Sequence, residues 1–295
     1  MSTDRAPVHV SVLPAETLTL LDPQAGQTWI DCTVGGGGHT RLLAERVGPT
    51  GRVIGLDQDP TMLELARSRL AGLPVELVHA NFDQLGEVLT ARGLERVDGV
   101  LADLGFSSDQ LGEKARGLSF REDGPLDMRL DPTAGATAAD MVNTMSEAGL
   151  ADTFWEFGEE RHSRRVAKRI VERRAHQPFT TTADFANVVR SCVPRSGSID
   201  PATRVFQALR IAVNDELGAL DRLLAMLPRV VKVGGAAGII SFHSLEDRRV
   251  KQVFREPTVW QQVTKKPVEA GDEETARNPR ARSAKLRVAR RVGDR

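Results

Sequence analysis

A run of four glycines stands where nucleotide-binding turns commonly occur. Gly35–Gly38 separates an apolar stretch, Thr28–Val34, from a helix expected over about His39–Val47. Glycines there permit a tight turn and bring the backbone close to a ligand at the helix N-terminus. Asp57 ends the next apolar stretch, where a carboxylate accepts hydrogen bonds from ribose hydroxyls. The pattern predicts a site for a nucleoside-containing cofactor.

The same glycine run distinguishes between cofactor classes. The dinucleotide fingerprint G-x-G-x-x-G needs a third glycine at the position of Thr40, where it allows close packing beside a pyrophosphate. Its absence disfavours an NAD-dependent dehydrogenase. A P-loop is excluded because no Gly-Lys-Ser/Thr follows the glycines. The alternative to a cofactor site is a glycine-rich turn with a structural role only, beside an acidic residue at the surface. The strand–turn–helix–strand context favours a binding site.

A second group of candidate residues follows the fourth apolar stretch, Val97–Leu104. Ligands of such folds bind beyond the carboxyl ends of the strands. Amino-group methyltransferases carry Asp/Asn/Ser-Pro-Pro-aromatic at this point, and here the residues are Asp-Leu-Gly-Phe. We therefore expect Asp103 to hold the hydrogens of an amine as the catalytic residue, and Phe106 to stack on an extruded base. A turn-capping aspartate with Phe106 in the core fits the spacing equally well.

A parallel sheet with helices on both faces would position these residues, because strands alternate with helices in the first third of the chain. Asp59 and Pro60 provide an N-cap and a first helical residue for the second helix. The expected strands are 28–34, 52–57, 75–80 and 97–104, and the expected helices are 39–47, 60–70 and 84–91.

The alternation stops after Leu104. The segment 105–140 is rich in Gly, Asp and Pro, and Ser196–Ser198 has the composition of a linker. A long helix is expected from Pro201, with Val205, Leu209, Ala212, Leu220, Leu224 and Leu227 on one buried face. Helices are also expected at 147–158, 160–175 and 182–193, and strands at 236–242, 259–268 and 284–292. We predict a doubly wound, Rossmann-like α/β domain of residues 1–108 and 203–295, interrupted by an all-helical insertion of residues 109–202.

Composition limits the protein class. The 295 residues carry 40 basic and 40 acidic side chains and only two cysteines, Cys32 and Cys192. Two cysteines give no disulfide framework or cysteine metal site, and we assign no residue to a metal. No apolar run approaches the roughly 18 residues of a membrane helix. The charged N-terminus is not a secretory signal. These observations favour a cytoplasmic enzyme that has no membrane partner.

Basic residues concentrate in the insertion. Arg164, Arg165, Lys168 and Arg169 lie three or four residues apart, so most of them share one helix face that fits an RNA phosphate backbone. A solvated face, partly neutralised by neighbouring glutamates, is the alternative. The basic segment 277–283 near the C-terminus is expected to be mobile or in contact with RNA.

Nine collinear segments resemble the bacterial 16S ribosomal RNA cytosine-N4 methyltransferase family. The resemblance implies a class I methyltransferase sheet and N4-methylation of a cytidine in the decoding region of 16S ribosomal RNA. It also implies that S-adenosylmethionine contacts Gly37, Gly38, His39, Asp57, Phe82, Asp103 and Gln110. Two positions depart from the family: Phe106 replaces a small aliphatic residue and Cys32 replaces a glycine. The segments are HVSVL (9–13), DCTVGGGGHT (31–40), DQDP (57–60), DLGFSSDQL (103–111), FREDGPLDMRLDP (120–132), GEER (158–161), ATRVFQALRIAVNDEL (202–217), SFHSLEDRRVK (241–251) and NPRARSAKLR (278–287).

Two rival functions remain beside the dehydrogenase. Carbon-5 methylation of cytosine needs a cysteine thiolate, but Cys32 lies inside the first strand and Cys192 in the insertion. A non-catalytic RNA-binding assembly factor would not need the complete set of cofactor residues. Both rivals are therefore disfavoured.

Overall fold

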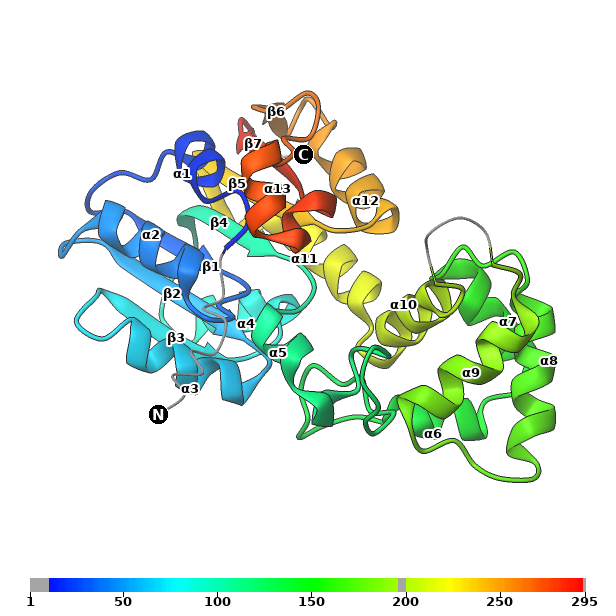
Figure 1. Ribbon diagram of the computed structural model, residues 1–295. Helices are drawn as coiled ribbons and strands as arrows, with labels where there is room; N and C mark the ends of the chain where they lie inside the picture. The colour runs from blue at the N-terminus through cyan, green and yellow to red at the C-terminus, as the bar shows by residue number, and fades with distance from the viewer. Residues whose placement is uncertain (1–10, 196–199, 294–295) are drawn as a thin grey trace. The chain divides into compact units, whose positions relative to one another are not determined.

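The computed structural model describes residues 11–195 and 200–293, which form two compact units (Figure 1). The first unit contains residues up to Ser107 and from Leu217 onward, and the second contains Ser108–Glu216. The second boundary therefore falls at Glu216, whereas the sequence placed it at residue 202. Residues 9–10 of the first family segment and the linker-like Ser196–Ser198 lie outside the described residues.

The first unit is built on a seven-stranded sheet in the order β3-β2-β1-β4-β5-β7-β6. Neighbouring strands from β3 to β5 run parallel, whereas β7 is antiparallel to both β5 and β6. This arrangement confirms the predicted Rossmann-like sheet. The strands are β1 (Thr28–Asp31), β2 (Arg52–Asp57), β3 (Val75–His79), β4 (Val97–Asp103), β5 (Val231–Ser241), β6 (Trp260–Gln262) and β7 (Lys285–Arg291).

Helices cover both faces of this sheet. Successive residues of a strand point to opposite faces, so their side chains pack in two separate apolar cores. On β1, Ile30 packs in a core with residues of α4, α11 and α12, whereas Trp29 packs in a core with residues of α1 and α2. The helical elements of this unit are α1 (Pro14–Leu21), α2 (Gly38–Val47), α3 (Pro60–Arg69), η1 (Phe82–Gln84), α4 (Leu85–Thr90), most of α11 (Glu216–Val230), α12 (Ser244–Phe254), α13 (Asp272–Arg277) and η3 (Pro279–Ser283).

Several predicted elements are wrong in extent: β1 ends at Asp31 and not at residue 34, and β5 begins at Val231 and not at residue 236. The strand expected over 259–268 is reduced to the three residues of β6, and Val268 forms only an isolated bridge to Leu286. The long helix expected from Pro201 is broken after α10 (Ala202–Val213) by Asp215, whose φ is 46°. A left-handed residue cannot continue a right-handed helix. Most of α11 therefore belongs to the first unit, whereas α10 packs in the second.

The second unit has its own apolar core. Phe179 and Phe185 meet edge to face with their ring centroids 5.5 Å apart, and Phe206 lies 5.5 Å from Phe185. Such pairs add to the stabilisation from burial. The helical elements are α5 (Ser108–Gly112), η2 (Lys114–Arg116), α6 (Ala138–Thr144), α7 (Glu147–Glu156), α8 (Ser163–Arg174), α9 (Thr182–Cys192) and α10.

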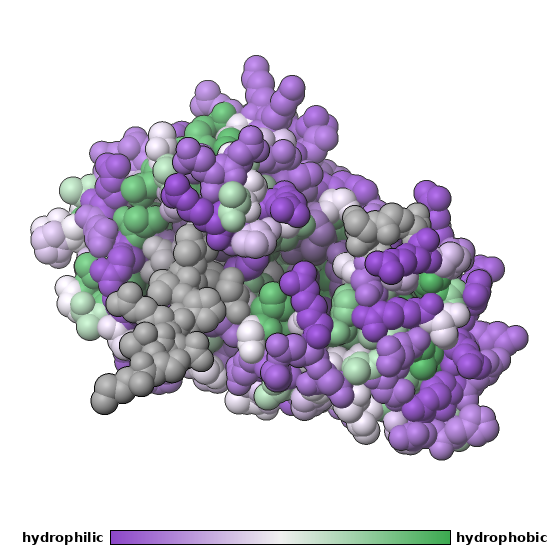
Figure 2. All heavy atoms as spheres, viewed as in Figure 1, coloured by the Kyte–Doolittle hydropathy of each residue, from purple (hydrophilic) through white to green (hydrophobic). Residues whose placement is uncertain are grey.

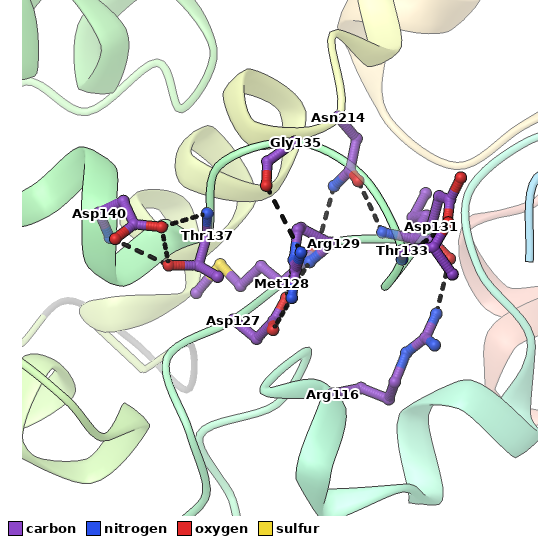
Figure 3. A network of polar contacts seen from close by, with 11 residues as sticks. Arg116, Asp127, Met128, Arg129, Asp131, Thr133, Gly135, Thr137, Asp140 and Asn214 are labelled. Atoms are coloured by element: carbon purple, nitrogen blue, oxygen red, sulfur yellow. Dashed lines mark hydrogen bonds and ion pairs between the residues drawn. The ribbon is translucent and has the colours of Figure 1, made fainter.

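A polar network fixes the glycine- and aspartate-rich segment of this unit (Figure 3). The Asn214 side chain accepts a hydrogen bond from the Leu130 amide at 2.7 Å and donates one to the Met128 carbonyl at 2.8 Å. The buried Arg116 donates to the Leu130 carbonyl at 2.7 Å. The segment lacks regular secondary structure, and these hydrogen bonds satisfy its backbone groups and hold it in place.

Helices that could cross a membrane are absent from residues 11–195 and 200–293: no helix there combines sufficient length with sufficient apolar character.

Candidate active site

The carboxyl ends of β1, β2, β3 and β4 lie along one edge of the sheet, because these strands are parallel. The glycine turn follows β1, Asp57 is the last residue of β2, Phe82 begins η1 after β3, and Asp103 ends β4. The structure thus gathers at one edge most of the residues that the sequence singled out. Their roles in binding and catalysis stay predictions.

The glycine turn has the conformation that glycine favours. Gly35 has a φ of 49° and Gly37 a φ of 86°, both in the left-handed region. A Cβ atom at Gly37 would lie 3.2 Å from Leu70 Cγ, so the turn has little space for a side chain. Helix α2 begins at Gly38 without a side-chain cap. Its first backbone amides are therefore oriented to bind a ligand at the helix N-terminus.

Asp57 holds this turn in place. Its Oδ2 accepts a hydrogen bond from the Gly35 amide at 2.7 Å, and its Oδ1 accepts one from the Asp59 amide at 2.9 Å. Burial raises the pKa of Asp57 to about 6 despite these bonds. Each carboxylate oxygen can accept more than one hydrogen bond, so capacity for ribose hydroxyls remains.

Asp103 is the most distinctive carboxyl group of the edge. Its amide donates to Thr33 Oγ1 at 2.6 Å, and its Oδ2 lies 4.0 Å from His39 Nε2. Its buried Oδ1 has no hydrogen-bond partner among the residues that the structure describes. Burial raises the pKa of Asp103 to about 7. A desolvated, unpaired carboxyl oxygen is costly unless a ligand completes its hydrogen bonding.

Arg280 is a site residue that the sequence analysis missed. The segment 277–283 was expected to be mobile or in contact with RNA. Most of it forms η3, in which Ala281 is buried, and Asn278 caps η3 by accepting a hydrogen bond from the Arg280 amide at 3.2 Å. The Arg280 guanidinium carbon lies 5.1 Å from the Phe242 ring centroid. Its positive charge lowers the pKa of Asp103, against the larger effect of burial. No spacing in the sequence indicated this approach.

Asp31 was also missed, although it stands in the glycine motif. It is fully buried at the end of β1 and accepts a hydrogen bond from Thr40 Oγ1 at 2.6 Å. Burial raises its pKa to about 6. Its charge also raises the pKa values of Asp57 and Asp103. The three carboxyl groups therefore form one electrostatically linked set.

His243 and Glu246 build the corner between β5 and α12. Glu246 accepts a hydrogen bond from the Phe242 amide at 2.8 Å, and its second oxygen lies 3.2 Å from His243 Nε2. Neither ring nitrogen of His243 has a hydrogen-bond partner among the residues that the structure describes.

Three further residues were predicted to contact cofactor or substrate: Phe82, Phe106 and Gln110. Phe82 is partly buried and packs against the core on one face of the sheet. Phe106 is partly buried in the loop after β4. Gln110 is buried in α5 of the second unit. Contact of these residues with cofactor or substrate stays a prediction.

The predicted RNA-binding residues form one exposed surface of α8 in the second unit. Arg164, Arg165, Lys168 and Arg169 are all exposed, whereas Val166, Ala167 and Ile170 are buried. Hydrophilic side chains predominate over this part of the second unit in Figure 2. Arg165, Lys168 and Arg169 also line a surface hollow with Ser191 of α9. Arg169 lies near an acid, 3.5 Å from Glu172.

Comparison with known proteins assigns the chain to a family. Residues 6–292 match the model of the MraW methylase family. The chain belongs to that family. It is therefore a methyltransferase, and S-adenosylmethionine is its methyl donor, as the sequence predicted.

Close relatives carry one name, Ribosomal RNA small subunit methyltransferase H. The protein of Sorangium cellulosum is 52% identical over 98% of this chain and 92% of its own length. The protein of Cyanothece sp. is 49% identical over 97% and 95%. The protein of Geotalea uraniireducens is 46% identical over 96% and 98%. The similarity thus covers both units.

Proposed function

We propose that the protein transfers a methyl group from S-adenosylmethionine to the exocyclic N4 amine of a specific cytidine in the decoding region of 16S ribosomal RNA. The observation that carries this proposal is the buried Asp103 carboxyl group, which ends β4 with an unpaired oxygen and a pKa raised by burial to about 7. An acceptor of this kind suits an uncharged amine better than a phosphate.

The chemistry requires help from the protein. The lone pair of a cytosine amine is delocalised into the ring, so the amine is a poor nucleophile. Hydrogen bonds from its two N–H groups to Asp103 and to the carbonyls of Leu104 and Gly105 localise that pair and orient the nitrogen. S-adenosylmethionine, when bound, supplies the electrophilic methyl group. Good placement of the reactants lowers the barrier by roughly 7–11 kcal/mol.

Asp103 is also suited to take the proton that the methylated amine releases. A general base works best with a pKa near the working pH, and that of Asp103 is raised to about 7. The nearby positive charge of Arg280 favours the ionised form. We therefore assign Asp103 both orientation of the amine and acceptance of its proton.

The glycine turn and strand ends would hold the cofactor. Their fit rests on the left-handed glycines, the uncapped start of α2 and the unpaired oxygen of Asp103. Asp57 binds the ribose hydroxyls and also holds the turn through Gly35. The assigned cofactor contacts are Gly37, Gly38, His39, Asp57, Phe82, Asp103 and Gln110.

The second unit is assigned to RNA recognition. A cytosine must leave its stack to reach a buried methyl donor, so the enzyme must grip the surrounding RNA. The exposed cations of α8 provide phosphate contacts. The shared name of the relatives supports 16S ribosomal RNA or the small subunit as the partner. A cytoplasmic location follows from that substrate.

Carbon-5 methylation of the same base is the rival reaction. It needs a thiolate nucleophile, but burial raises the pKa of Cys32 well above its usual value and also raises that of Cys192. Both thiols therefore stay protonated near neutral pH, which favours reaction at the amine.

The test is transfer from labelled S-adenosylmethionine to small-subunit particles that lack their native methylations, followed by nucleoside mass spectrometry. We expect label in N4-methylcytidine, at one site in the decoding region. Label in 5-methylcytidine would establish the rival reaction, and unlabelled RNA despite tight cofactor binding would show that the substrate is wrong.

A further inference from the structure

The chain segments that leave β4 and β5 stay side by side beyond the sheet. Asp103 ends β4 and is paired with Ile240 of the parallel strand β5. The Leu104 amide donates to the Ile240 carbonyl at 2.9 Å, so the loop after β4 is bound to the end of β5. Phe242 directly follows β5. The aromatic ring thus belongs to the segment next to the loop that begins at Asp103.

The Phe242 ring links this loop to Arg280. Gly105 has a φ of 89°, and a Cβ atom on it would lie 3.8 Å from Phe242 Cδ2. The guanidinium carbon of Arg280 lies over the same ring, 5.1 Å from its centroid, and attraction between cation and ring orients the guanidinium. Burial raises the pKa of Asp103, and the positive charge of Arg280 counteracts this rise, so the two groups lie within electrostatic range.

The backbone that carries Arg280 is anchored. Asn278 caps η3 by accepting a hydrogen bond from the Arg280 amide at 3.2 Å. Ala281 and Ala284 are buried in the core that also contains residues of α1 and α2. The Arg280 side chain itself is partly buried. A cation on a fixed backbone, oriented by an aromatic ring, is suited to one specific contact.

The chemistry of the substrate base indicates what this contact is. In cytosine the ring nitrogen N3 is bonded to the carbon that carries the amine, and N3 accepts hydrogen bonds. In guanine the ring nitrogen beside the amine carries a hydrogen and donates instead. A guanidinium has only N–H donors, so it matches the cytosine pattern and opposes the guanine pattern. Proteins read unstacked RNA bases through hydrogen bonds of this kind to the base-pairing edge.

We propose that Arg280 is a specificity-determining residue that donates a hydrogen bond to N3 of the target cytosine, while Asp103 and the carbonyls of Leu104 and Gly105 hold the amine. The inference rests on the proposed N4-methylation. The role of Arg280 is recognition and orientation of the base, and Asp103 remains the acceptor of the proton.

Removal of N3 from the substrate tests this contact. The substrates are small-subunit particles reconstituted from ligated 16S ribosomal RNA that carries either cytidine or 3-deazacytidine at the methylated position. 3-Deazacytidine keeps the amine and has a C–H group in place of N3. The preference for cytidine is the ratio of the two kcat/KM values. We expect this preference to be about tenfold larger in the unsubstituted protein than in Arg280→Leu, the effect of losing a hydrogen bond to a charged group.

The comparison isolates the contact with N3. The different reactivity of the two amines is common to both proteins, and the effect of the lost charge on Asp103 is common to both substrates, so both cancel. Arg282→Leu is the matched control, because Arg282 lies in the same η3 and is exposed. It should keep the full preference. Calorimetry with S-adenosylhomocysteine checks that each variant retains an intact cofactor site. If Arg280→Leu does not fold, Arg280→Gln, which lacks the terminal guanidinium nitrogens, gives the same comparison.

Two results would overturn the inference and leave the proposed reaction intact. One is an equal preference for cytidine in the unsubstituted protein and the Arg280 variant. The other is an equal loss of preference in Arg282→Leu, which would assign the effect to the charge of η3 in general. Absence of N4-methylcytidine with the unsubstituted protein would instead overturn the proposed function, and this inference with it.

Discussion

The polar groups of the two units are arranged in opposite ways. In the irregular segment of the second unit, Asp127 makes paired hydrogen bonds to Arg129 at 2.9 and 2.8 Å, and Asn214 binds backbone groups through both ends of its amide. At the sheet edge of the first unit, Asp103 keeps a buried oxygen without a partner among the described residues.

This difference separates stabilising residues from functional ones. A satisfied network stabilises an irregular chain, whereas an unsatisfied buried group lowers stability until a ligand binds it. The hydrogen bonds of Asp127 and Asn214 therefore serve the structure of the second unit. The edge of the first unit retains its hydrogen-bonding capacity for cofactor and base. Substitutions in the two regions should accordingly affect different properties.

The largest effect on stability should come from the second unit. Asn214→Ala removes hydrogen bonds to Leu130, Met128 and Arg210, and we expect the free energy of unfolding to fall by about 3 kcal/mol. Denaturant unfolding measures this change. Asn187→Ala, at an exposed position of α9, is the control and should cost well below 1 kcal/mol. Equal losses for the two variants would show that the network does not stabilise the unit.

Asp103→Asn should have the opposite sign. The folded protein raises the pKa of Asp103 from 3.8 to about 7, so the folded state retains a proton that the unfolded state has lost between these values. Stability therefore falls as pH rises from about 4 to 7, and the penalty persists above pH 7. We therefore expect the variant to be more stable than the unsubstituted protein at pH 8, by an amount that falls to almost nothing at pH 4.

Thermal unfolding at both pH values checks this prediction. Asp221→Asn serves as the control because Asp221 is an exposed acid. A variant that is destabilised at pH 8 would mean that Asp103 contributes to stability like the carboxylates of the second unit.

Arg280→Gln should shift a pH profile with little change in stability. The Arg280 charge lowers the pKa of Asp103, so its removal raises that pKa and leaves the carboxyl group protonated up to a higher pH. The midpoint of the rise of methyl-transfer rate with pH should move upward. Arg280→Lys should restore most of the shift. An unchanged midpoint in the glutamine variant would remove Arg280 from the site.

The smallest effects should come from single cations of α8. Lys168→Gln removes one exposed positive charge, and we expect RNA affinity to fall about two- to threefold. The slope of log affinity against log salt should decrease by about one. Lys266→Gln, at an exposed position of the first unit, should change neither quantity. If the slope of log affinity against log salt is the same for Lys168→Gln as for the unsubstituted protein, Lys168 is not a phosphate contact.

Much of the sheet could be predicted from local signals. The second strand is confirmed as β2, with the predicted bounds, and Asp59 caps α3 through the Thr61 amide at 2.9 Å as its position before Pro60 indicated. Alternation of apolar and helical segments was enough to place Asp57 and Asp103 at strand ends. The periodicity of apolar residues and the capping of helices depend on residues close together in the chain, so they can be recognised in a single sequence.

The errors came from contacts between distant parts of the chain. The helix break at Asp215 is accompanied by bonds from Asn214 to the 128–130 segment, which no helical periodicity shows. The approach of Arg280 to Phe242 joins two segments that lie far apart in the sequence, and nothing in either segment indicated that they meet. Burial of Asp31 likewise became evident only from the packed sheet.

The most direct test of the account is the single-turnover rate of methyl transfer by Asp103→Asn, with cofactor and small-subunit RNA both saturating. We predict a loss of about 100-fold or more, because the amide side chain of the variant cannot take the proton that the methylated amine releases. RNA binding by the variant should be unchanged. A rate within about threefold of the unsubstituted protein would contradict the assignment of Asp103 as the catalytic residue.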